Sequence, residues 1–286
     1  FELAKMANPD VRVFVSDPTW PNHLSILKYL DMEIVNYRYF DNETRGVDFD
    51  AMITDLSTAK QGDVVLLHGC CHNPTGADLT QAQWRQVAEV AQQQGWLPFI
   101  DSAYLGFGDD LETDAYGMRL MVESVPEVII AASCSKNFGL YRERVGLAVM
   151  VTENSAQTPI VQSQIQAIAR GIYSMPPSYG GALVDIILHD EALKASWVAE
   201  VDEMRNRMRD LRSLLVNKLA ENGAQKDFSF VNQQKGMFSF LCISPEQVKA
   251  VRADHSVYFV DSSRVNIAGI NLTNVDALAK ALVSVL

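Results

Sequence analysis

The sequence predicts an α/β fold, with a mostly parallel sheet flanked by helices and a smaller C-terminal α+β domain. The first half of the 286-residue chain contains a series of short, apolar, β-rich segments. Helical patterns separate these segments, as is typical of a sheet that is covered on both faces. Near residue 190 one long helical pattern replaces the alternation, which indicates a second domain.

Six segments are predicted as strands because they are short and rich in β-branched and aromatic residues. They span residues 11–16, 33–38, 64–68, 97–101, 128–133 and 145–151. Residues 79–95 are predicted as a helix, because Thr80 and Gln83 form a capping-box pattern and Gly95 is a stop signal. Residues 1–10 have the pattern of the end of an amphipathic helix, as though the chain began partway through a domain.

The second half begins with a predicted helix over residues 190–222, where apolar residues recur every three or four positions. We expect its arginines at 205, 207, 209 and 212 on a solvated face. A β-like stretch over 228–243, a helix opened by a capping box at Ser244, a short strand over 258–260 and a last helix from Thr273 follow. The predicted large domain is residues 1–195 and the small domain residues 196–286.

The composition excludes several classes of partner. Lys and Arg total 24 against 35 Asp and Glu, a net charge of −11, which argues against nucleic acid and anionic membranes. No apolar stretch reaches the ~18 residues of a membrane span. The start of the chain lacks signal-peptide features, and the four cysteines have neither CxxC nor disulfide-like spacing. A cytoplasmic location is therefore predicted.

Four polar segments each follow a predicted strand: DPTWPNH (17–23), HGCCHNPTG (68–76), DSAY (101–104) and SCSK (133–136), with Arg144 shortly after. In open α/β sheets, ligands bind outside the carboxyl ends of the strands, so we expect these segments to converge on one crevice. They supply an amine, a carboxylate, a phenol, an amide, an indole and a guanidinium. That inventory suits pyridoxal phosphate chemistry.

Each of these groups has a task in such chemistry. A lysine amine forms a Schiff base with an aldehyde and can shuttle protons when its pKa is lowered. A carboxylate that faces the pyridine nitrogen keeps it protonated, so that the ring withdraws electrons. Tyrosine and asparagine can hydrogen-bond the ring hydroxyl, an indole can stack on the ring, and arginine with serine can hold the phosphate.

The strings WPNH, HGCCHNPTG, DSAY, SKNFGLYRERVG, YSMPP and RVNIAG occur in this order from about residue 11 to the C-terminus. Together they resemble the class I, fold-type I aminotransferases of the aspartate and aromatic amino acid group. The resemblance implies a homodimeric pyridoxal phosphate enzyme. It would move an amino group between aspartate, glutamate or an aromatic amino acid and a 2-oxo acid, in ping-pong half-reactions.

The resemblance also implies a set of cofactor-binding residues, namely Lys136, Asp101, Tyr104, Asn73, Trp20, Ser133, Ser135 and Arg144. Lys136 would form the Schiff base, and Asp101 would face the ring nitrogen with His23 behind it. Tyr104 and Asn73 would bind the ring hydroxyl. Lys136, Asp101 and Tyr104 would be the catalytic residues.

The remaining implied roles concern the ring face, the phosphate and the substrate. Trp20 would stack on the ring, and Ser133 and Arg144 would take the phosphate. Arg264 would clamp the substrate α-carboxylate, and Arg170 would reach into the neighbouring subunit's site for a side-chain carboxylate. Trp20, with Asn73, would also contact the substrate. The resemblance further implies cis peptide bonds at Asp17–Pro18 and Asn73–Pro74.

This sequence departs from the family pattern in two ways. The family's domain normally begins upstream, with an arm, a phosphate-cupping loop, a further strand and a tyrosine donated across the dimer. These are not in this chain, so weaker cofactor binding is expected. Met175 and Leu105 stand where many members carry Asn and Gln, which bears on substrate preference.

Taken one at a time, these residues have simpler interpretations. Lys136 alone would be a surface lysine, Asp101 a helix N-cap and Trp20 a packing residue. Arg264 and Arg170 are assigned only through the strings around them. The histidines at 23, 68 and 72 match no standard zinc spacing, so no metal is expected. His68 and His72 are interpreted as packing or supporting residues, and the adjacent cysteines at 70 and 71 as inert.

Two alternative functions remain. The same cofactor could serve β-elimination or decarboxylation, which the residues alone do not separate from amino transfer. The chain could instead be a truncated, non-catalytic remnant that folds and self-associates. Colour distinguishes the last alternative, because bound cofactor absorbs near the visible range.

Overall fold

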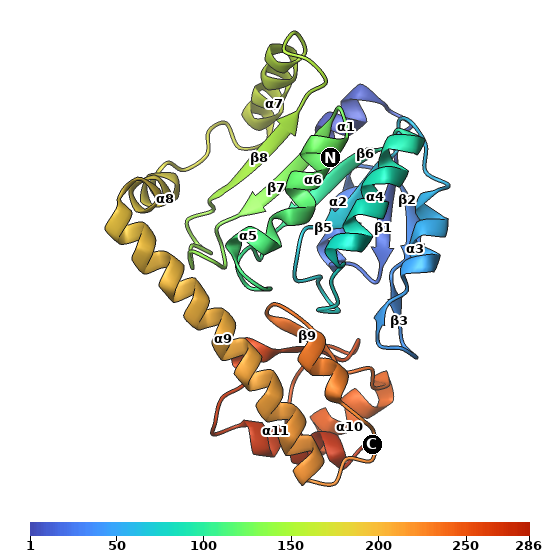
Figure 1. The fold of residues 1–286 in the computed structure, drawn as a ribbon, viewed down its shortest axis with the longest axis vertical. Helices are drawn as coiled ribbons and strands as arrows, with labels where there is room; N and C mark the ends of the chain where they lie inside the picture. The colour runs from blue at the N-terminus through green and yellow to red at the C-terminus, as the bar shows by residue number, and fades with distance from the viewer.

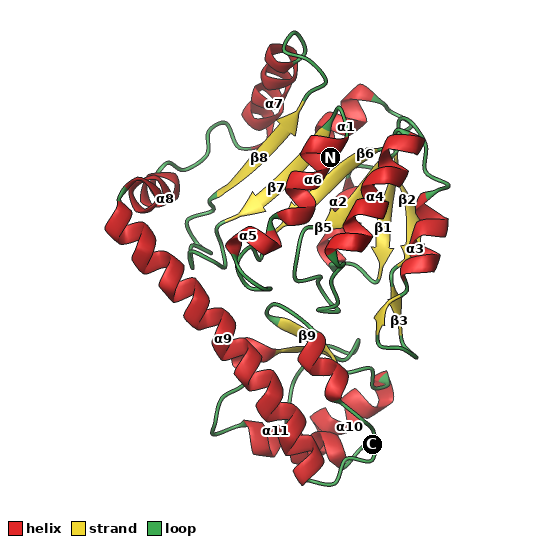
Figure 2. Ribbon diagram, in the orientation of Figure 1, coloured by secondary structure: helices red, strands yellow, loops and turns green.

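The computed structural model describes residues 1–286, in which a six-stranded sheet lies above a smaller unit built on the lower half of a long helix (Figures 1 and 2). The strand order in the sheet is β2-β1-β5-β6-β7-β8. The strands are β1 (Arg12–Asp17), β2 (Glu33–Arg38), β5 (Val64–His68), β6 (Leu97–Ser102), β7 (Val128–Ser133) and β8 (Gly146–Val151). All six predicted strands are therefore confirmed, each to within one residue at either end.

Five of the six strands run parallel, and β8 is antiparallel to β7. The prediction of a mostly parallel sheet is confirmed. His68 pairs with Asp101 across β5 and β6, so these two strands end side by side. Because β8 runs in the opposite direction, Gly146 at its start pairs with Ser133 at the end of β7. This pairing brings Arg144, just before β8, to the edge where the parallel strands end.

Helices cover both faces of the sheet, as the alternating pattern predicts. The helices α3 (Phe49–Leu56), α4 (Gln81–Gln94) and α6 (Tyr116–Ser124) pack against one set of strand side chains, which includes Phe14 and Ile100. The helices α1 (Glu2–Ala7) and α2 (Pro21–Tyr29) pack against the opposite set, which includes Val13 and Phe99. The short helix α5 (Leu111–Asp114) and the hairpin of β3 (Phe40–Asp41) and β4 (Gly46–Val47) complete this part.

The local signals of α4 are all present. The Thr80 hydroxyl accepts from the Gln83 backbone N–H at 3.2 Å, and the Gln83 side chain accepts from the Thr80 N–H at 2.8 Å. Gly95 ends the helix with a φ of 73°, in the left-handed region that favours glycine. Both X–Pro bonds predicted as cis, Asp17–Pro18 and Asn73–Pro74, are cis.

The chain continues from β8 through α7 (Thr158–Ile172) and α8 (Tyr179–His189) into the long helix α9 (Glu191–Glu221). Beyond α9 lie the 3₁₀ turn η1 (Ser229–Gln233), β9 (Phe238–Phe240), α10 (Pro245–His255), β10 (Arg264–Asn266), η2 (Ile267–Gly269) and α11 (Val275–Val283). The Ser244 capping box of α10 is present. The helix α9 passes the predicted domain boundary at residue 195 without a break (Figure 1).

Two local predictions are wrong. The stretch 228–243 is mostly a 3₁₀ turn and irregular chain, with only β9 extended. No strand forms over 258–260, where Tyr258 is 75 % exposed; the pairing strand is β10, with Arg264 opposite Phe240. Val265 of β10 is buried at 4 %, so burial of an apolar side chain selects residues 264–266 instead.

The prediction of a solvated arginine face on α9 is also wrong for Arg205 and Arg212. Both side chains are buried, and Arg212 donates to the Ser239 hydroxyl at 3.1 Å and to the Phe238 carbonyl at 3.0 Å. The reason is that α9 packs against both parts of the molecule, so its polar positions face backbone carbonyls. A guanidinium can be buried when such acceptors satisfy its N–H groups.

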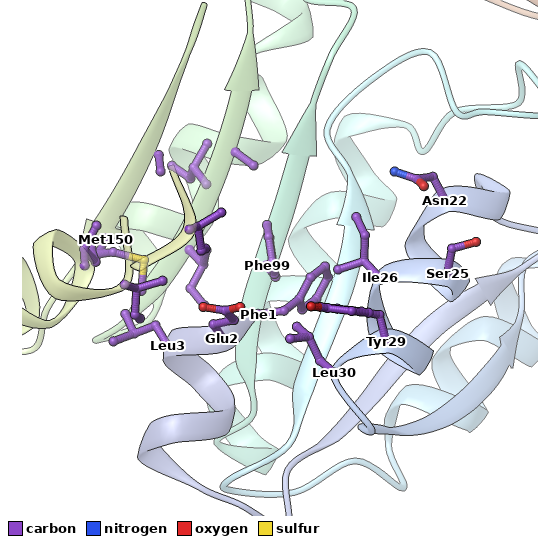
Figure 3. Close-up of a pocket in the computed structure, with 17 residues that line it drawn as sticks. Phe1, Glu2, Leu3, Asn22, Ser25, Ile26, Tyr29, Leu30, Phe99 and Met150 are labelled. Atoms are coloured by element: carbon purple, nitrogen blue, oxygen red, sulfur yellow. The ribbon is translucent and has the colours of Figure 1, made fainter. Parts of the chain in front are cut away.

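None of the helices is long and apolar enough to span a membrane. One large hollow, about 500 Å³, lies between α1, α2, α7 and the strands β6 to β8 (Figure 3). Apart from Glu2, Asn22 and Ser25, the side chains around it are apolar or aromatic. This hollow therefore offers no set of groups for catalysis, and the chemistry must lie elsewhere.

Candidate active site

A second cavity, of about 400 Å³, lies where β5, β6 and β7 end. Nine of the residues predicted from the sequence line it, namely Lys136, Asp101, Tyr104, Asn73, Trp20, Ser133, Ser135, Arg144 and Arg264. Of the first eight, Asp101 and Ser133 lie at the ends of β6 and β7, and the others lie in loops that follow strands of the sheet or precede β8. Arg264 comes from β10 of the C-terminal part. The predicted convergence at the strand ends is therefore present in the fold.

Lys136 lies in the loop after β7, and its Nζ is 4.7 Å from the centre of the Tyr104 ring. Burial lowers the pKa of Lys136, and the charge of Arg144 lowers it further, while Asp101 acts in the opposite direction. More of the amine is therefore neutral near pH 7 than for an exposed lysine. A neutral amine is the form that attacks a carbonyl carbon or accepts a proton.

Asp101 is the second-last residue of the strand β6, and its Oδ2 is 2.9 Å from Nε2 of His23. Burial alone would raise the pKa of Asp101. The hydrogen bond with His23 and the charges of neighbouring basic groups, Lys136 among them, together outweigh burial, and the pKa of Asp101 lies below its ordinary value. Asp101 is therefore held as a carboxylate with a fixed orientation inside the cavity.

His23 belongs to a longer hydrogen-bonded chain that the sequence did not reveal. Its Nδ1 is 3.0 Å from the Thr19 hydroxyl, which is 3.2 Å from Nε2 of His68. Burial holds the pKa of His68 well below its ordinary value, so His68 is neutral. Thr19 lies within the DPTWPNH segment and His68 opens HGCCHNPTG, but only the fold shows that they meet. The chain fixes the ring of His23 and, through it, Asp101.

A second network joins the two parts of the molecule. Nη1 of Arg264 donates to Oδ1 of Asn73 at 2.9 Å, and Nδ2 of Asn73 is 3.5 Å from the Tyr104 hydroxyl. The guanidinium also lies over the ring of Phe238, 4.3 Å from its centre. Burial raises the pKa of Tyr104, and Asp101 raises it further, so the phenol stays protonated and can donate. This wall combines a fixed cation with an amide and a phenol.

The third wall carries small hydroxyls and an arginine. The Ser133 hydroxyl accepts from the Ser135 backbone N–H at 3.1 Å, and Ser135 is buried. Arg144 donates to the Tyr141 carbonyl at 2.8 Å and has a φ of 53°, a left-handed conformation that is costly for a side chain other than glycine. Trp20, 38 % exposed, lies at the rim with its ring edge-on to His23. This wall can receive an anionic group.

Arg170 does not join these residues within one chain. It lies in the last turn of α7, exposed, and its guanidinium contacts the Ser174 hydroxyl. The cavity lining does not include it. The position of Arg170 is thus compatible only with a role outside this chain's own cavity.

The profile of the family described as aminotransferase class I and II matches residues 1–282. The chain belongs to this family. It is 50% identical to the aromatic-amino-acid aminotransferase of Paracoccus denitrificans over 284 residues, which is 99% of this chain and 72% of that relative. It is 47% identical to the aspartate aminotransferase of Escherichia coli over 275 residues, 96% of this chain and 69% of that protein.

The fold of this chain is also similar to those of solved aminotransferase structures. An aromatic-amino-acid aminotransferase from Burkholderia pseudomallei, covalently bound to pyridoxal phosphate, superposes with a TM-score of 0.97 at 42% identity. The match covers 100% of this chain and 71% of that one. This aminotransferase therefore has the fold-type I architecture, and its cofactor is pyridoxal phosphate.

The chemistry of the cavity fits that cofactor. An aldehyde needs an amine, a pyridine nitrogen needs a carboxylate, a ring hydroxyl needs donors and a phosphate needs a cation with hydroxyls. Lys136, Asp101, Tyr104 and Arg144 provide one group for each, around one cavity. One group of each kind that the cofactor needs is thus present around the cavity.

Proposed function

We propose that this aminotransferase moves amino groups between aspartate, glutamate or aromatic amino acids and 2-oxo acids. Relatives at 40–50% identity carry both the aspartate and the aromatic names, which supports this substrate range. The observation that carries the proposal is that one cavity holds an amine with a lowered pKa and a guanidinium bound to an amide, Lys136 and Arg264 with Asn73. The Lys136 amine suits attack on a carbonyl carbon and proton transfer. The Arg264 guanidinium suits binding of a substrate carboxylate.

In the proposed site, Lys136, Asp101 and Tyr104 are the catalytic residues. Pyridoxal phosphate, when bound, supplies an aldehyde and an electron-withdrawing ring. Lys136 holds the cofactor and then moves a proton at the substrate α-carbon, for which its lowered pKa is suited. Asp101, fixed by His23, faces the ring nitrogen. Tyr104 and Asn73 donate to the ring oxygen, with the phenol kept protonated by burial.

The phosphate and substrate contacts complete the proposal. Ser133, Ser135 and Arg144 hold the phosphate, since a guanidinium with nearby hydroxyls forms charge-assisted hydrogen bonds. Arg264 binds the α-carboxylate bidentately, releasing the Asn73 amide oxygen that it contacts at 2.9 Å. Trp20, at the rim, covers the ring face.

We further propose a homodimer in which Arg170 serves the partner's cavity. The segment from β8 to α8 exposes large apolar side chains that a monomer rarely leaves in water, among them Leu147, Ile160, Ile172, Met175, Tyr179 and Ile186. Arg170 lies on the same segment, outside its own cavity. A second copy that covers this surface could receive Arg170 for a substrate side-chain carboxylate.

Two other expectations remain proposals. The large and small domains meet near residue 195, inside α9, and a helix shared by both would move as one rigid body. The four cysteines are unpaired, which supports the reduced, cytoplasmic compartment predicted from the sequence.

Substitution of the two arginines tests the function. Arg264→Ala should weaken every amino donor, because all donors have an α-carboxylate. Arg170→Ala should weaken aspartate and glutamate by roughly 10²-fold and leave phenylalanine and tyrosine unchanged or improved, since a buried charge pair is lost only for the former. Steady-state kcat/KM over a donor panel measures both effects. Equal loss of aspartate and phenylalanine activity in Arg170→Ala would contradict the assignment.

Mixed dimers test the partner role of Arg170. Subunits carrying Arg170→Ala, combined with subunits carrying Lys136→Ala, give one site in which both residues are intact. Dicarboxylate activity should therefore return on mixing. No recovery from dimers shown to be mixed would contradict the action across the interface, and a colourless, inactive parent protein would favour the non-catalytic alternative.

A further inference from the structure

The loop that carries Lys136 is attached to the helix α9 by a tryptophan. Trp197, in the second turn of α9, donates its indole N–H to the backbone carbonyl of Asn137 at 2.8 Å. Its ring also stacks on Phe138, with 4.3 Å between centroids and an angle of 14°. Asn137 and Phe138 directly follow Lys136, so both contacts act on the backbone that holds the lysine.

The same loop is tied to the segment that follows Tyr104. Nδ2 of Asn137 donates to the Leu105 carbonyl at 3.2 Å, and Asn137 is buried. One turn further along α9 from Val201, Arg205 donates to the Gly106 carbonyl at 3.2 Å. Trp197, Val201 and Arg205 are spaced by four residues, so they share one face of the helix. This face contacts the loops that carry Lys136 and follow Tyr104.

We infer that Trp197 is a positioning residue for Lys136, which holds the lysine backbone so that the amine stays over Tyr104. The inference rests on the proposed role of Lys136. A lysine side chain is long and flexible, so its amine can be placed only if its backbone is fixed. Within the loop, two backbone bonds close around Lys136, from the Gly139 N–H to the Lys136 carbonyl at 3.1 Å and from the Leu140 N–H to the Cys134 carbonyl at 3.3 Å. Gly139 itself has a φ of 68°, and nothing would contact a Cβ there.

Trp197 acts from outside the cavity, because it is absent from the lining that includes Lys136, Asn73 and Arg264. Its loss should therefore affect the reaction step more than substrate binding. Small misplacement of a reacting group can cost a large factor in rate. A tryptophan that only packed α9 against the large domain would change stability and leave the behaviour of the Lys136 amine unaltered.

The test compares Trp197→Phe with a matched control. Phenylalanine keeps a ring for stacking on Phe138 but has no N–H. The control is Trp96→Phe, because the indole N–H of Trp96 is buried and has no hydrogen-bond partner. We expect Trp197→Phe to lower kcat roughly three- to tenfold, the effect of one lost hydrogen bond, with KM changed less than about twofold. Trp96→Phe should leave kcat within about twofold.

A second measurement uses the cofactor-free protein. The pH midpoint for acylation of the Lys136 amine, followed by mass spectrometry, reports the environment of the lysine without any turnover. In the parent, burial holds the pKa of Lys136 below its ordinary value. A loosened loop admits water, so the midpoint should rise in Trp197→Phe and rise further in Trp197→Ala, which also loses the stack. Trp96→Phe should not move it.

The outcomes separate this inference from the proposed function. An unchanged midpoint and an unchanged kcat in a folded Trp197→Phe protein would overturn the inference, as would an equal shift in the Trp96→Phe control. Should Trp197→Phe prove unstable, Phe138→Leu removes the stack from the loop side and must raise the same midpoint. Retention of covalent cofactor by Lys136→Ala would instead contradict the proposed role of Lys136 in the function. The acylation midpoint could still be compared between the parent protein and Trp197→Phe, because both keep Lys136.

Discussion

The sheet has a covered side around β5 to β7 and an uncovered side at the β8 edge, with α7 and α8. In β5, the first four residues are buried, and α3, α4 and α6 close one face of the neighbouring strands. In β8, no residue is fully buried; α7 contains no buried residue, and α8 contains only Gly180 (Figure 1). The covered side holds the strand ends with Lys136 and Asp101, and the uncovered side holds Arg170.

One chain fixes its own polar groups at the strand ends but leaves the apolar surface at the β8 edge without a covering. On the covered side, polar groups such as the buried His23 and the partly buried Asp101 have partners in the same chain, so their orientation is fixed without help. On the uncovered side, apolar side chains such as Ile172, 61 % exposed, lack such partners. We therefore expect the cofactor chemistry to depend on the covered side and the assembly of the dimer to depend on the uncovered side.

The largest expected effect is that of Lys136→Ala on the covered side. Turnover should fall by roughly 10⁴-fold or more, since the amine serves in both attachment and proton transfer. Assembly and folding should be unchanged. Borohydride reduction of the coloured protein followed by peptide mapping should place the label on Lys136, and the exposed Lys28 provides the control substitution, Lys28→Ala. A label on another lysine would show that the site is wrongly assigned.

The next effect is that of Asp101→Ala, which removes the carboxylate while leaving the cavity in place. α-Proton abstraction in single turnovers should slow by roughly 10²- to 10³-fold, the range for loss of one oriented charged group. His23→Gln should have a smaller effect in the same direction, because it loosens Asp101 without removing its charge. Near-normal single-turnover rates in Asp101→Ala would contradict its proposed position at the ring nitrogen.

The uncovered side is tested by adding charge. Leu147→Glu with Tyr179→Glu places carboxylates on β8 and α8 at positions that are 62 % and 68 % exposed. A charge buried without a partner is strongly unfavourable, so the dimer should dissociate at concentrations at which the parent is paired. Sedimentation equilibrium measures this change. The control is Leu272→Glu, at an 82 % exposed position beyond β10, which should leave assembly intact. A monomeric parent protein would refute the proposed dimer.

The smallest effect concerns the pH dependence of stability on the covered side. Burial lowers the pKa of His72 from 6.5 to about 3. As the pH falls below 6.5, the unfolded chain takes up this proton and the folded chain does not, so stability is lost by about 1.4 kcal/mol per pH unit. Burial raises the pKa of the neighbouring Asp78 to about 6, so the folded chain takes up this proton first and Asp78 adds stability as the pH falls. The difference between variants therefore isolates His72.

His72→Gln should remove about 2 kcal/mol of the stability loss between pH 6.5 and 5. Urea unfolding at both pH values measures it, and His255→Gln, at an exposed position on α10, is the control. The same loss with and without His72 would mean that the imidazole is already protonated in the folded chain, or that it is hydrated.

Local sequence signals predicted the elements well where the interactions that form them are local. The capping boxes at Thr80 and Ser244 each join residues three positions apart, and both are present. The β-branched runs of the six strands in the main sheet also needed no knowledge of distant residues, whereas the short hairpin of β3 and β4 was not predicted. The motif strings predicted which residues line the cavity, because each string follows a strand and parallel strands end on the same edge.

Other features depended on contacts between distant segments. The sequence offered residues 258–260 as a strand, but the partner β9 pairs with 264–266. Arg205 and Arg212 carry polar side chains at positions typical of a solvated face, yet neighbouring loops bury them. The bond from Trp197 to Asn137 joins residues 60 positions apart, which the apolar spacing of the helix alone does not predict.

From the sequence alone we could place the six strands of the main sheet, the helices α4, α9, α10 and α11, and the polar residues at the strand ends, and we could see the resemblance to one family. This was possible because helix caps, strand propensity and motif spacing act over a few residues. Which polar groups meet became clear from the tertiary structure. Thr19 meets His68, and Arg264 meets Asn73, which lies 191 positions away in the chain. The physical reason is that hydrogen bonds and burial depend on distances in space, which the packing of α9 and the sheet sets for all of these residues together.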